Sequence, residues 1–449
     1  MITALFYVYL AAALVIGCLC ARKISTPDDF YVAGRRAGVP YITGSLLATI
    51  LGSSAILGSI DLAYAKGWAG AWFMLCAAIG LLALLPFVKR LSAFRGYNLP
   101  VLLGSFYGPV AQKLTAGVIA IAWLGVIGAQ IIGAAKITAS VCGMQYSVAA
   151  VLIGLALTAY TAAGGQLSII RTDLIQVLLI FAGLLAIFGA AFFRSAPTSA
   201  QPLLSAAFTP FDLLVMLFAY SSTFLVGPDI YSRLFCAKDT STARMAVALS
   251  AMILIPTAFM LAFIGIYGSG LYVRGDESIL FAIVKNEFPK SIAVLMYFAL
   301  LSAIMSSADT TLFTAGSLLS QFIREKMDTK ESVRLTRICT AALGMLAIVT
   351  ALHCQSLLTA LLFALGVYAG AFVVPALWGM LGLRSDGKHA IAAIAAGGLL
   401  ALAGKLLPAK PYGNILVLLA FPANLALLSL GTLHRRHECS PQNTQNTQK

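Results

Sequence analysis

The chain has 449 residues, of which 60% are hydrophobic and only 10% are charged, and its formal net charge is +14. A soluble domain has about 25% charged residues, so the composition excludes a soluble globular protein and favours a polytopic membrane protein. The basic residues lie mainly between apolar segments, which is a topology signal and not the pattern of a nucleic-acid-binding surface.

Apolar runs close to the ~20 residues that cross a bilayer recur along the whole chain. We therefore predict an all-α polytopic membrane protein with about thirteen transmembrane helices. The predicted spans are residues 2–21, 40–65, 68–88, 112–138, 146–164, 170–193, 211–235, 243–270, 290–322, 335–353, 356–381, 388–406 and 413–433.

The distribution of lysine and arginine predicts the orientation. With the N-terminus outside, 22 of the 30 basic residues fall on the cytoplasmic side, among them Arg233, and seven fall outside, among them Lys405; Lys136 lies within a span. This asymmetry follows the positive-inside rule, and an even number of spans would spoil it. We expect an outer N-terminus and a cytoplasmic C-terminus in the inner or plasma membrane.

Residues 1–434 are predicted to form one transmembrane domain, followed by a polar cytoplasmic tail at 435–449 that we expect to be disordered. The first span has no basic residue before it and charges after it, which favours an uncleaved helix over a signal peptide. The eight cysteines lack metal-binding spacing and are expected to be small buried hydrophobic residues.

Small residues crowd the middle of the span at 40–65, where Gly52, Ser53, Ser54 and Gly58 lie close together. They have two explanations, namely close packing against another helix or a local break that exposes backbone carbonyls to a cavity. Packing is favoured when this span is considered alone. The hydroxyl cluster at 302–320, described below, favours the break.

Two polar residues lie within the span at 112–138. Lys136 is near the outer end, so we expect it to extend to the interface. Gln130 is nearer the middle, where a hydrogen bond between helices and a role in a cavity are equally compatible with its position.

The segment GGQLSIIRTDLIQ joins the fifth and sixth spans. Gly164 and Gly165 permit a tight cytoplasmic turn, and Asp173 enters the apolar run that follows. An acid in the first turn of a helix stabilises the helix N-terminus. The spacing alone favours this capping role over a place on an ion exit path.

The seventh span, at 211–235, contains Gly227, Pro228 and Asp229. Proline removes a backbone donor and interrupts a helix, so this span is a second broken-helix candidate. Interrupted helices in corresponding halves of a chain are the sequence sign of a transporter with inverted repeats and a central binding site.

The ninth span carries the strongest polar signal in the chain. Within residues 290–322, hydroxyls and one acid gather at Ser306, Ser307, Asp309, Thr310 and Thr311. Such a cluster inside a bilayer is costly unless its oxygens bind something or face a cavity. We interpret it as an ion site.

The stretches DDFYVAGRR, GGQLSIIRTDLIQ and SAIMSSADTTLF occur in this order, and the chain resembles the sodium:solute symporter family. The resemblance covers most of the chain and implies the LeuT-type fold, a 5+5 inverted repeat. The first repeat would cover about 40–194 and the second about 205–383, with one extra N-terminal helix and two C-terminal helices.

The resemblance also implies a sodium site between the second and ninth spans. Its ligands would be backbone carbonyls of Ala48, Leu51 and Ala303 and the hydroxyls of Ser306 and Ser307. Neutral oxygens bind a monovalent cation weakly enough to release it.

Three further residues match the family's ion path. Asp173 matches an acid along the inward path, which favours that role over capping, and Asp309 and Thr310 stand where some members bind a second sodium. A carboxylate replaces the usual hydroxyl at Asp309, so a second sodium, a proton and a structural bond all stay open.

The substrate residues suggested by the sequence are Gly52, Ser53, Ser54, Gln130 and Gly227. The glutamine of sugar-transporting relatives falls near Ala55, which argues against a sugar. The GPDIYSR segment is similar to the proline and pantothenate branches and implies a small amino acid or carboxylate, and half-helix dipoles suit an anionic group.

The predicted function is secondary active transport, in which Na⁺ drives uptake of a small organic solute by alternating access. The expected partners are Na⁺, the solute and the lipid bilayer, with no nucleic acid and no further cofactor, in a monomer. A proton-coupled carrier would instead use Asp173 or Asp309. A channel would need a continuous polar stripe, which the spans lack, and no residue group has the spacing of an enzyme site.

Overall fold

The structure is a computed structural model that describes residues 2–94, 96–194, 201–273, 278–324, 328–353, 358–407 and 412–438. Within these ranges the regular structure is helical, apart from two isolated β-bridges. The helices of the first half are α1 (Ile2–Ala21), α2 (Pro27–Val32), α3 (Val39–Ile50), α4 (Ser53–Lys66), α5 (Trp72–Leu84), α6 (Val88–Ala93), α7 (Leu99–Tyr107), α8 (Pro109–Cys142) and α9 (Tyr146–Phe192).

Ten more α-helices follow among the described residues of the second half, and the all-α prediction is confirmed. They are α10 (Pro210–Met216), α11 (Ser222–Leu225), α12 (Pro228–Leu234), α13 (Thr240–Ser269), α14 (Ile279–Glu287), α15 (Lys290–Ile323), α16 (Lys330–His353), α17 (Leu358–Met380), α18 (Gly387–Leu406) and α19 (Tyr412–Glu438).

Among the described residues, ten helices are long and apolar enough to cross a membrane. The predicted number of thirteen spans is not confirmed by this count. One reason is that α9 continues for 47 residues through two predicted spans, and another is that α3 is only 12 residues long. α19 continues to Glu438, into the predicted polar tail, whose residues 439–449 lie outside the described residues.

The expected turn at Gly164 and Gly165 is a kink within α9. Gly165 has φ 53° and ψ −148°, a conformation that is essentially restricted to glycine. A Cβ there would lie 2.6 Å from a ring carbon of Phe30. Asp173 lies eight residues further on and is buried within the helix, so the interpretation of Asp173 as a first-turn cap is wrong.

The helix of the second span is broken, as the ion-site hypothesis required. α3 ends at Ile50, and Leu51 and Gly52 separate it from α4. A Cβ on Gly52 would lie 2.6 Å from the Ser307 hydroxyl of α15, so this glycine also permits close approach. The break and the packing explanations therefore apply to the same residue.

The seventh span is broken at its glycine and proline. Val226 and Gly227 separate α11 from α12, and Pro228 is the first residue of α12, where its missing N–H has no helical partner to lose. Both predicted breaks are thus present. The division of the chain into two repeats stays a prediction.

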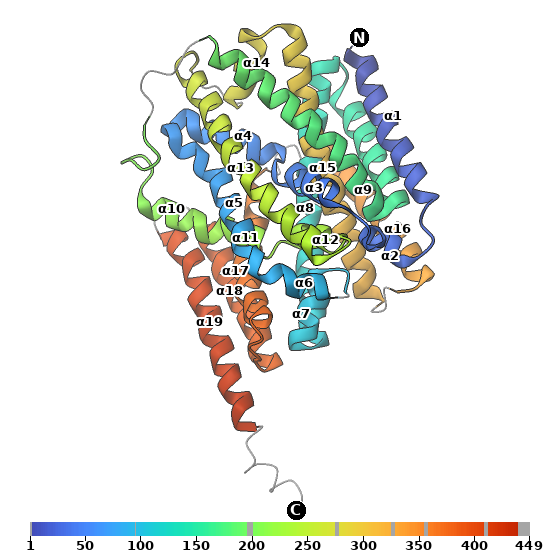
Figure 1. Ribbon diagram of the computed structural model, residues 1–449, viewed down its shortest axis with the longest axis vertical. Coiled ribbons are helices and arrows are strands. Elements are labelled where there is room, and N and C mark those ends of the chain that lie inside the picture. Colours follow the sequence, from blue (N-terminus) through green and yellow to red (C-terminus); the bar gives the residue numbers. More distant parts are fainter. Residues whose placement is uncertain are drawn as a thin grey trace, which may run out of the picture.

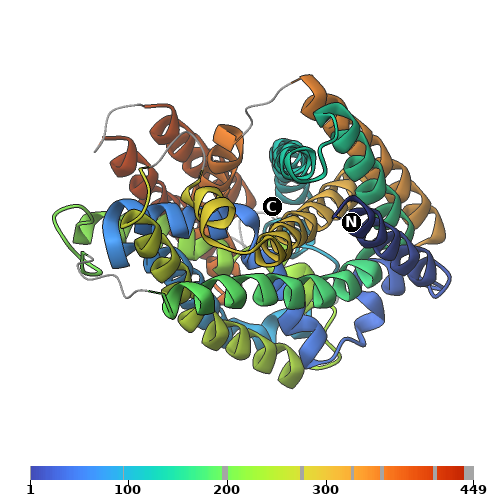
Figure 2. The same cartoon turned by 90° about the horizontal axis from the view of Figure 1, so that it is seen from above.

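The arrangement of the long helices places α15 in the interior. It packs against α8, α9 and α16, while α1 packs on α9. Figure 2 shows α17, α18 and α19 gathered on one flank and α1 on the other. The N-terminus and the C-terminal end of α19 lie at opposite ends of the molecule (Figure 1).

The connection after α1 is fixed by a capping box at α2. Thr26 accepts a hydrogen bond from the Asp29 N–H, and the Asp29 carboxylate accepts one from the Thr26 N–H at 2.9 Å. Burial raises the pKa of Asp29, but hydrogen bonds from Thr26 and Ser25 outweigh it, so the pKa lies below its ordinary value. This link holds Phe30 against the kink at Gly165.

Candidate functional site

The two helix breaks and α15 border one cavity of about 240 Å³. Gly52 comes from the first break, Ser54 from the first turn of α4, Gly227 from the second break, and Ser307 from α15. The other lining residues are mainly apolar or aromatic: Thr49, Ile50, Ala55, Phe73, Trp123, Val126, Gln130, Met216, Ala219, Tyr220, Thr223, Phe224, Pro228, Asp229, Thr311, Tyr368 and Lys405.

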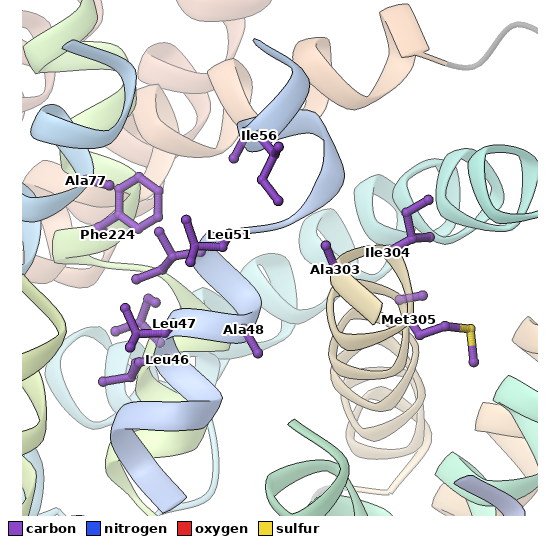
Figure 3. Packing of buried hydrophobic residues seen from close by; sticks show 14 of the residues in the cluster. Leu46, Leu47, Ala48, Leu51, Ile56, Ala77, Phe224, Ala303, Ile304 and Met305 are labelled. Atoms are coloured by element: carbon purple, nitrogen blue, oxygen red, sulfur yellow. The ribbon is translucent and has the colours of Figure 1, made fainter. Parts of the chain in front are cut away.

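The predicted sodium ligands Ala48, Leu51, Ala303 and Ser307 lie where α3 ends beside α15. The Ser307 hydroxyl donates to the Ala303 carbonyl at 3.1 Å and also lies 3.5 Å from the Thr49 carbonyl. Figure 3 shows Ala48 pointing from α3 towards α15, with Ala303 on the facing side and Leu51 at the end of α3. Carbonyls in the last turn of a helix lack helical N–H partners, so this end of α3 supplies free acceptors.

Ser306, the fifth predicted ligand, points to a buried acid on α9. Its hydroxyl donates to Asp173 Oδ1 at 2.5 Å, and the Ser45 hydroxyl of α3 donates to Oδ2. A hydroxyl that donates its single proton keeps its two lone pairs for another partner. Ser306 therefore connects the region around α3 to Asp173.

Arg233 completes this buried group. Charge counting placed it among the cytoplasmic loop residues, whereas it lies within α12 and is fully buried. Its Nη2 lies 3.2 Å from Asp173 Oδ2, and neither side chain is exposed to solvent. The same nitrogen donates to the Thr310 hydroxyl, and Nε donates to the Ser45 carbonyl at 3.4 Å. A charged residue within an apolar span needs a partner, and this was the available sequence signal for Arg233.

Asp309 has its own set of partners. Tyr160 of α9 donates to Asp309 Oδ2 at 2.8 Å, and the Thr310 hydroxyl lies 3.2 Å from Oδ1. Thr310 also donates to the Ser306 carbonyl at 3.0 Å. Of the three alternatives for Asp309, the structural bond thus has identified partners; Tyr160 was not foreseen from the sequence.

Four of the five predicted substrate residues line the cavity. Gly52, Ser54, Gln130 and Gly227 line the cavity, while Ser53 is not among the lining residues. Sequence reasoning missed the aromatic walls, because no local pattern distinguishes them from ordinary buried aromatics. They comprise Phe73 against Tyr220, with ring centres 4.3 Å apart, and Trp123 against Tyr368, with ring centres 5.5 Å apart.

Tyr368 also fixes the second break. Its hydroxyl donates to the carbonyl of Val226, the residue that directly follows α11. The interrupted helix therefore has one of its freed carbonyls satisfied by a side chain from α17. This contact connects the aromatic wall of the cavity to the broken helix.

The fold matches that of solved ion-coupled transporters. The structure of a Na⁺-coupled sialic acid symporter in a substrate-bound outward-open state superimposes with a TM-score of 0.79, covering 96% of this chain and 97% of that chain at 18% identity. Mhp1, a nucleobase-cation-symport-1 family transporter, gives a TM-score of 0.60 at 16% identity, covering 93% of this chain and 97% of that one. The protein thus has the LeuT-type fold.

Residues 30–397 match the sodium:solute symporter family, and the chain belongs to it. The sodium/proline symporter of Haemophilus influenzae is 26% identical, over 98% of this chain and 96% of that protein. The sodium/pantothenate symporter of Escherichia coli is 21% identical, over 87% of this chain and 88% of that protein. Membership confirms the predicted class, a transporter and not an enzyme, and implies Na⁺ as the coupling ion.

Proposed function

We propose that this protein couples the inward movement of Na⁺ to the uptake of a small organic solute, an amino acid or a carboxylate, by alternating access. The observation that carries the proposal is that two broken helices and the hydroxyl-rich α15 border one cavity. A membrane potential contributes ~2.3 kcal/mol per charge per 100 mV, so one Na⁺ can drive substantial accumulation of a solute.

The proposed Na⁺ ligands are the carbonyls of Ala48, Leu51 and Ala303 and the hydroxyls of Ser306 and Ser307. Both hydroxyls donate their protons elsewhere, Ser307 to Ala303 and Ser306 to Asp173, which leaves oxygen lone pairs for a cation. Neutral oxygen ligands suit an ion that must be released on each cycle.

Asp173 is proposed to lie on the inward path of Na⁺, because its carboxylate accepts a hydrogen bond from Ser306, one of the proposed ion ligands. We propose that the N-terminus is outside, that the C-terminus is cytoplasmic and that the monomer is the functional unit in the inner or plasma membrane. A second ion at Asp309 and Thr310 would have to share these side chains with Tyr160 and Arg233.

Uptake by the purified protein in proteoliposomes tests the coupling. Proline, other small amino acids, pantothenate and short carboxylates are each supplied with an inward Na⁺ gradient, and again with a proton gradient alone. Uptake that requires Na⁺ supports the proposal. Uptake driven by protons alone would contradict it and move the coupling role to Asp173 or Asp309.

The serine variants test the ion site within the same assay. Ser306→Ala and Ser307→Ala are each expected to raise the Na⁺ concentration for half-maximal uptake at least about tenfold, because each removes an ion ligand. Ser317→Ala is the matched control, since Ser317 is buried on the same helix and bonds the Thr314 carbonyl at 2.9 Å. Unchanged Na⁺ dependence in both site variants would refute the ligand assignment.

A further inference from the structure

Two of the described residues that line the cavity carry a formal charge, and the charges are opposite. Asp229 comes from α12 and Lys405 from α18. The rest of this lining is apolar, aromatic or neutral polar. A buried charge that faces an apolar cavity is costly without a partner, and this applies to Asp229. Lys405 is more exposed, and its charge favours an anionic group of a ligand in the same cavity.

Within the described part of the chain, no side chain forms an ion pair or a hydrogen bond with the Asp229 carboxylate; backbone N–H groups and the nearby charge of Arg233 act on it. Arg233 on the same helix donates to the main-chain carbonyl of Asp229 at 3.1 Å and pairs with Asp173. Asp229 Oδ1 lies 2.7 Å from the place of a Cβ on Gly227, so the glycine leaves room for this carboxylate at the helix break.

A capping role is the competing explanation for Asp229. The residue is in the first turn of α12, where its carboxylate interacts with its own N–H and that of Ile230. An acid in this position stabilises a helix N-terminus whether or not a ligand binds. Capping does not explain why the side chain also borders the cavity, and the two roles predict different results on substitution.

Lys405 lies beyond the residues that match the sodium:solute symporter family. The family match ends at residue 397, and Lys405 lies in the last turn of α18. Its side chain is exposed and forms no ion pair within the described ranges. It shares the cavity with Trp123 and Tyr368, which form one of the aromatic walls.

We propose that Asp229 and Lys405 are the two charged poles of the solute site, and that the solute is a small zwitterionic amino acid. Asp229 pairs with its protonated amine and Lys405 with its carboxylate, while the aromatic side chains contact its apolar part. The volume of about 240 Å³ restricts the solute to a small molecule. This inference rests on the proposed function and selects the amino acid over a carboxylate that lacks an amine.

Analogues that lack one charge separate the two poles. Na⁺-driven uptake of L-proline, L-alanine and L-serine is measured in proteoliposomes, with pyrrolidine as an amine without a carboxylate and cyclopentanecarboxylate as a carboxylate without an amine. We expect uptake of at least one amino acid. Na⁺-driven uptake of pantothenate alone would overturn this inference while leaving the proposed function intact, and no Na⁺-driven uptake of any solute would count against both.

Asp229→Asn is expected to raise the half-saturating amino-acid concentration at least about tenfold, because a charge-assisted contact is lost. Inhibition of this variant by cyclopentanecarboxylate should not change.

Lys405→Gln should likewise weaken amino-acid uptake several-fold and leave inhibition by pyrrolidine unchanged. The matched controls are Asp239→Asn, at the exposed N-cap of α13, and Lys388→Gln, in the first turn of α18.

Asp229→Glu keeps the charge and the capping role but moves the carboxylate, so it tests the proposal if Asp229→Asn does not fold. A raised half-saturating concentration in this variant supports a contact with the solute. Lower thermal stability with unchanged amino-acid affinity would show capping and overturn the proposal. A changed Na⁺ requirement with unchanged amino-acid affinity would assign Asp229 to an ion and overturn it as well.

Discussion

The ion pair between Arg233 and Asp173 brings a fixed positive charge into the predicted ion path. Both side chains are fully buried, and their contacts extend to Ser45, Ser306 and Thr310. Removing two charges from water is costly, and their attraction offsets that cost only when the geometry is good and the remaining atoms are hydrogen-bonded. The surrounding hydroxyls meet this condition.

Breaking this pair should destabilise the protein strongly. Arg233→Gln is expected to cost about 3–5 kcal/mol, because it leaves an unpaired buried carboxylate at Asp173. The double variant Arg233→Gln, Asp173→Asn should recover much of the loss. Thermal unfolding in detergent measures both effects.

The pair Arg194 and Glu287 provides the control. Its charged atoms are also 3.2 Å apart, but the side chains are 46% and 25% exposed. Arg194→Gln should change stability by no more than about 1 kcal/mol, as for other solvent-exposed ion pairs. Equal losses at the two sites would contradict the role assigned to burial.

At the level of the helices, the kink in α9 determines how the two parts of this long helix meet the segment that follows α1. Gly165→Ala should destabilise the protein by more than about 1 kcal/mol, since alanine disfavours its backbone conformation and a Cβ would contact Phe30. Thermal unfolding and the yield of folded protein measure the loss.

Gly189→Ala is the matched control on the same helix. It has no atom within 4 Å of the added Cβ, and its φ is not positive. Alanine also has the higher helix propensity, so this substitution should be neutral or slightly stabilising. A similar loss at Gly165 and Gly189 would show that the kink does not depend on glycine.

The helix breaks could be predicted from sequence because their causes are local. Gly52 followed by two serines, and Gly227 followed by Pro228, interrupt helices whatever packs around them. The partners of Arg233 and Asp309 could not be found in this way. Asp173 and Tyr160 are 60 and 149 residues away from them, and only the packing of α9 against the other helices brings these groups together.

For the molecule as a whole, the distribution of basic residues predicts that the two ends of the chain lie on opposite sides of the membrane. Alkaline phosphatase, which is active only outside the cytoplasm, should be active when fused after Gly270 and inactive when fused after Arg324 or Glu438. Green fluorescent protein should give the opposite pattern. Phosphatase activity after Glu438 would contradict the predicted orientation.

The number of spans was harder to predict than the kind of fold. Apolar composition identifies a membrane protein without reference to its helix ends, whereas the count depends on where each helix stops. In α9 the chain bends at Gly165 without leaving the helical conformation for more than that residue. A count based on apolar runs therefore cannot be compared directly with a count of long helices.

The walls of the cavity come from helices that are far apart in the sequence. The oxygen atoms of the candidate ion site come from α3 and α15, whereas Tyr368 and Lys405 come from α17 and α18 on one flank of the molecule (Figure 2). Substitutions on that flank can alter which cargo is accepted without changing a single ion ligand. The proposed solute selectivity and the proposed ion coupling therefore depend partly on different helices, so that one can be altered by substitution without the other.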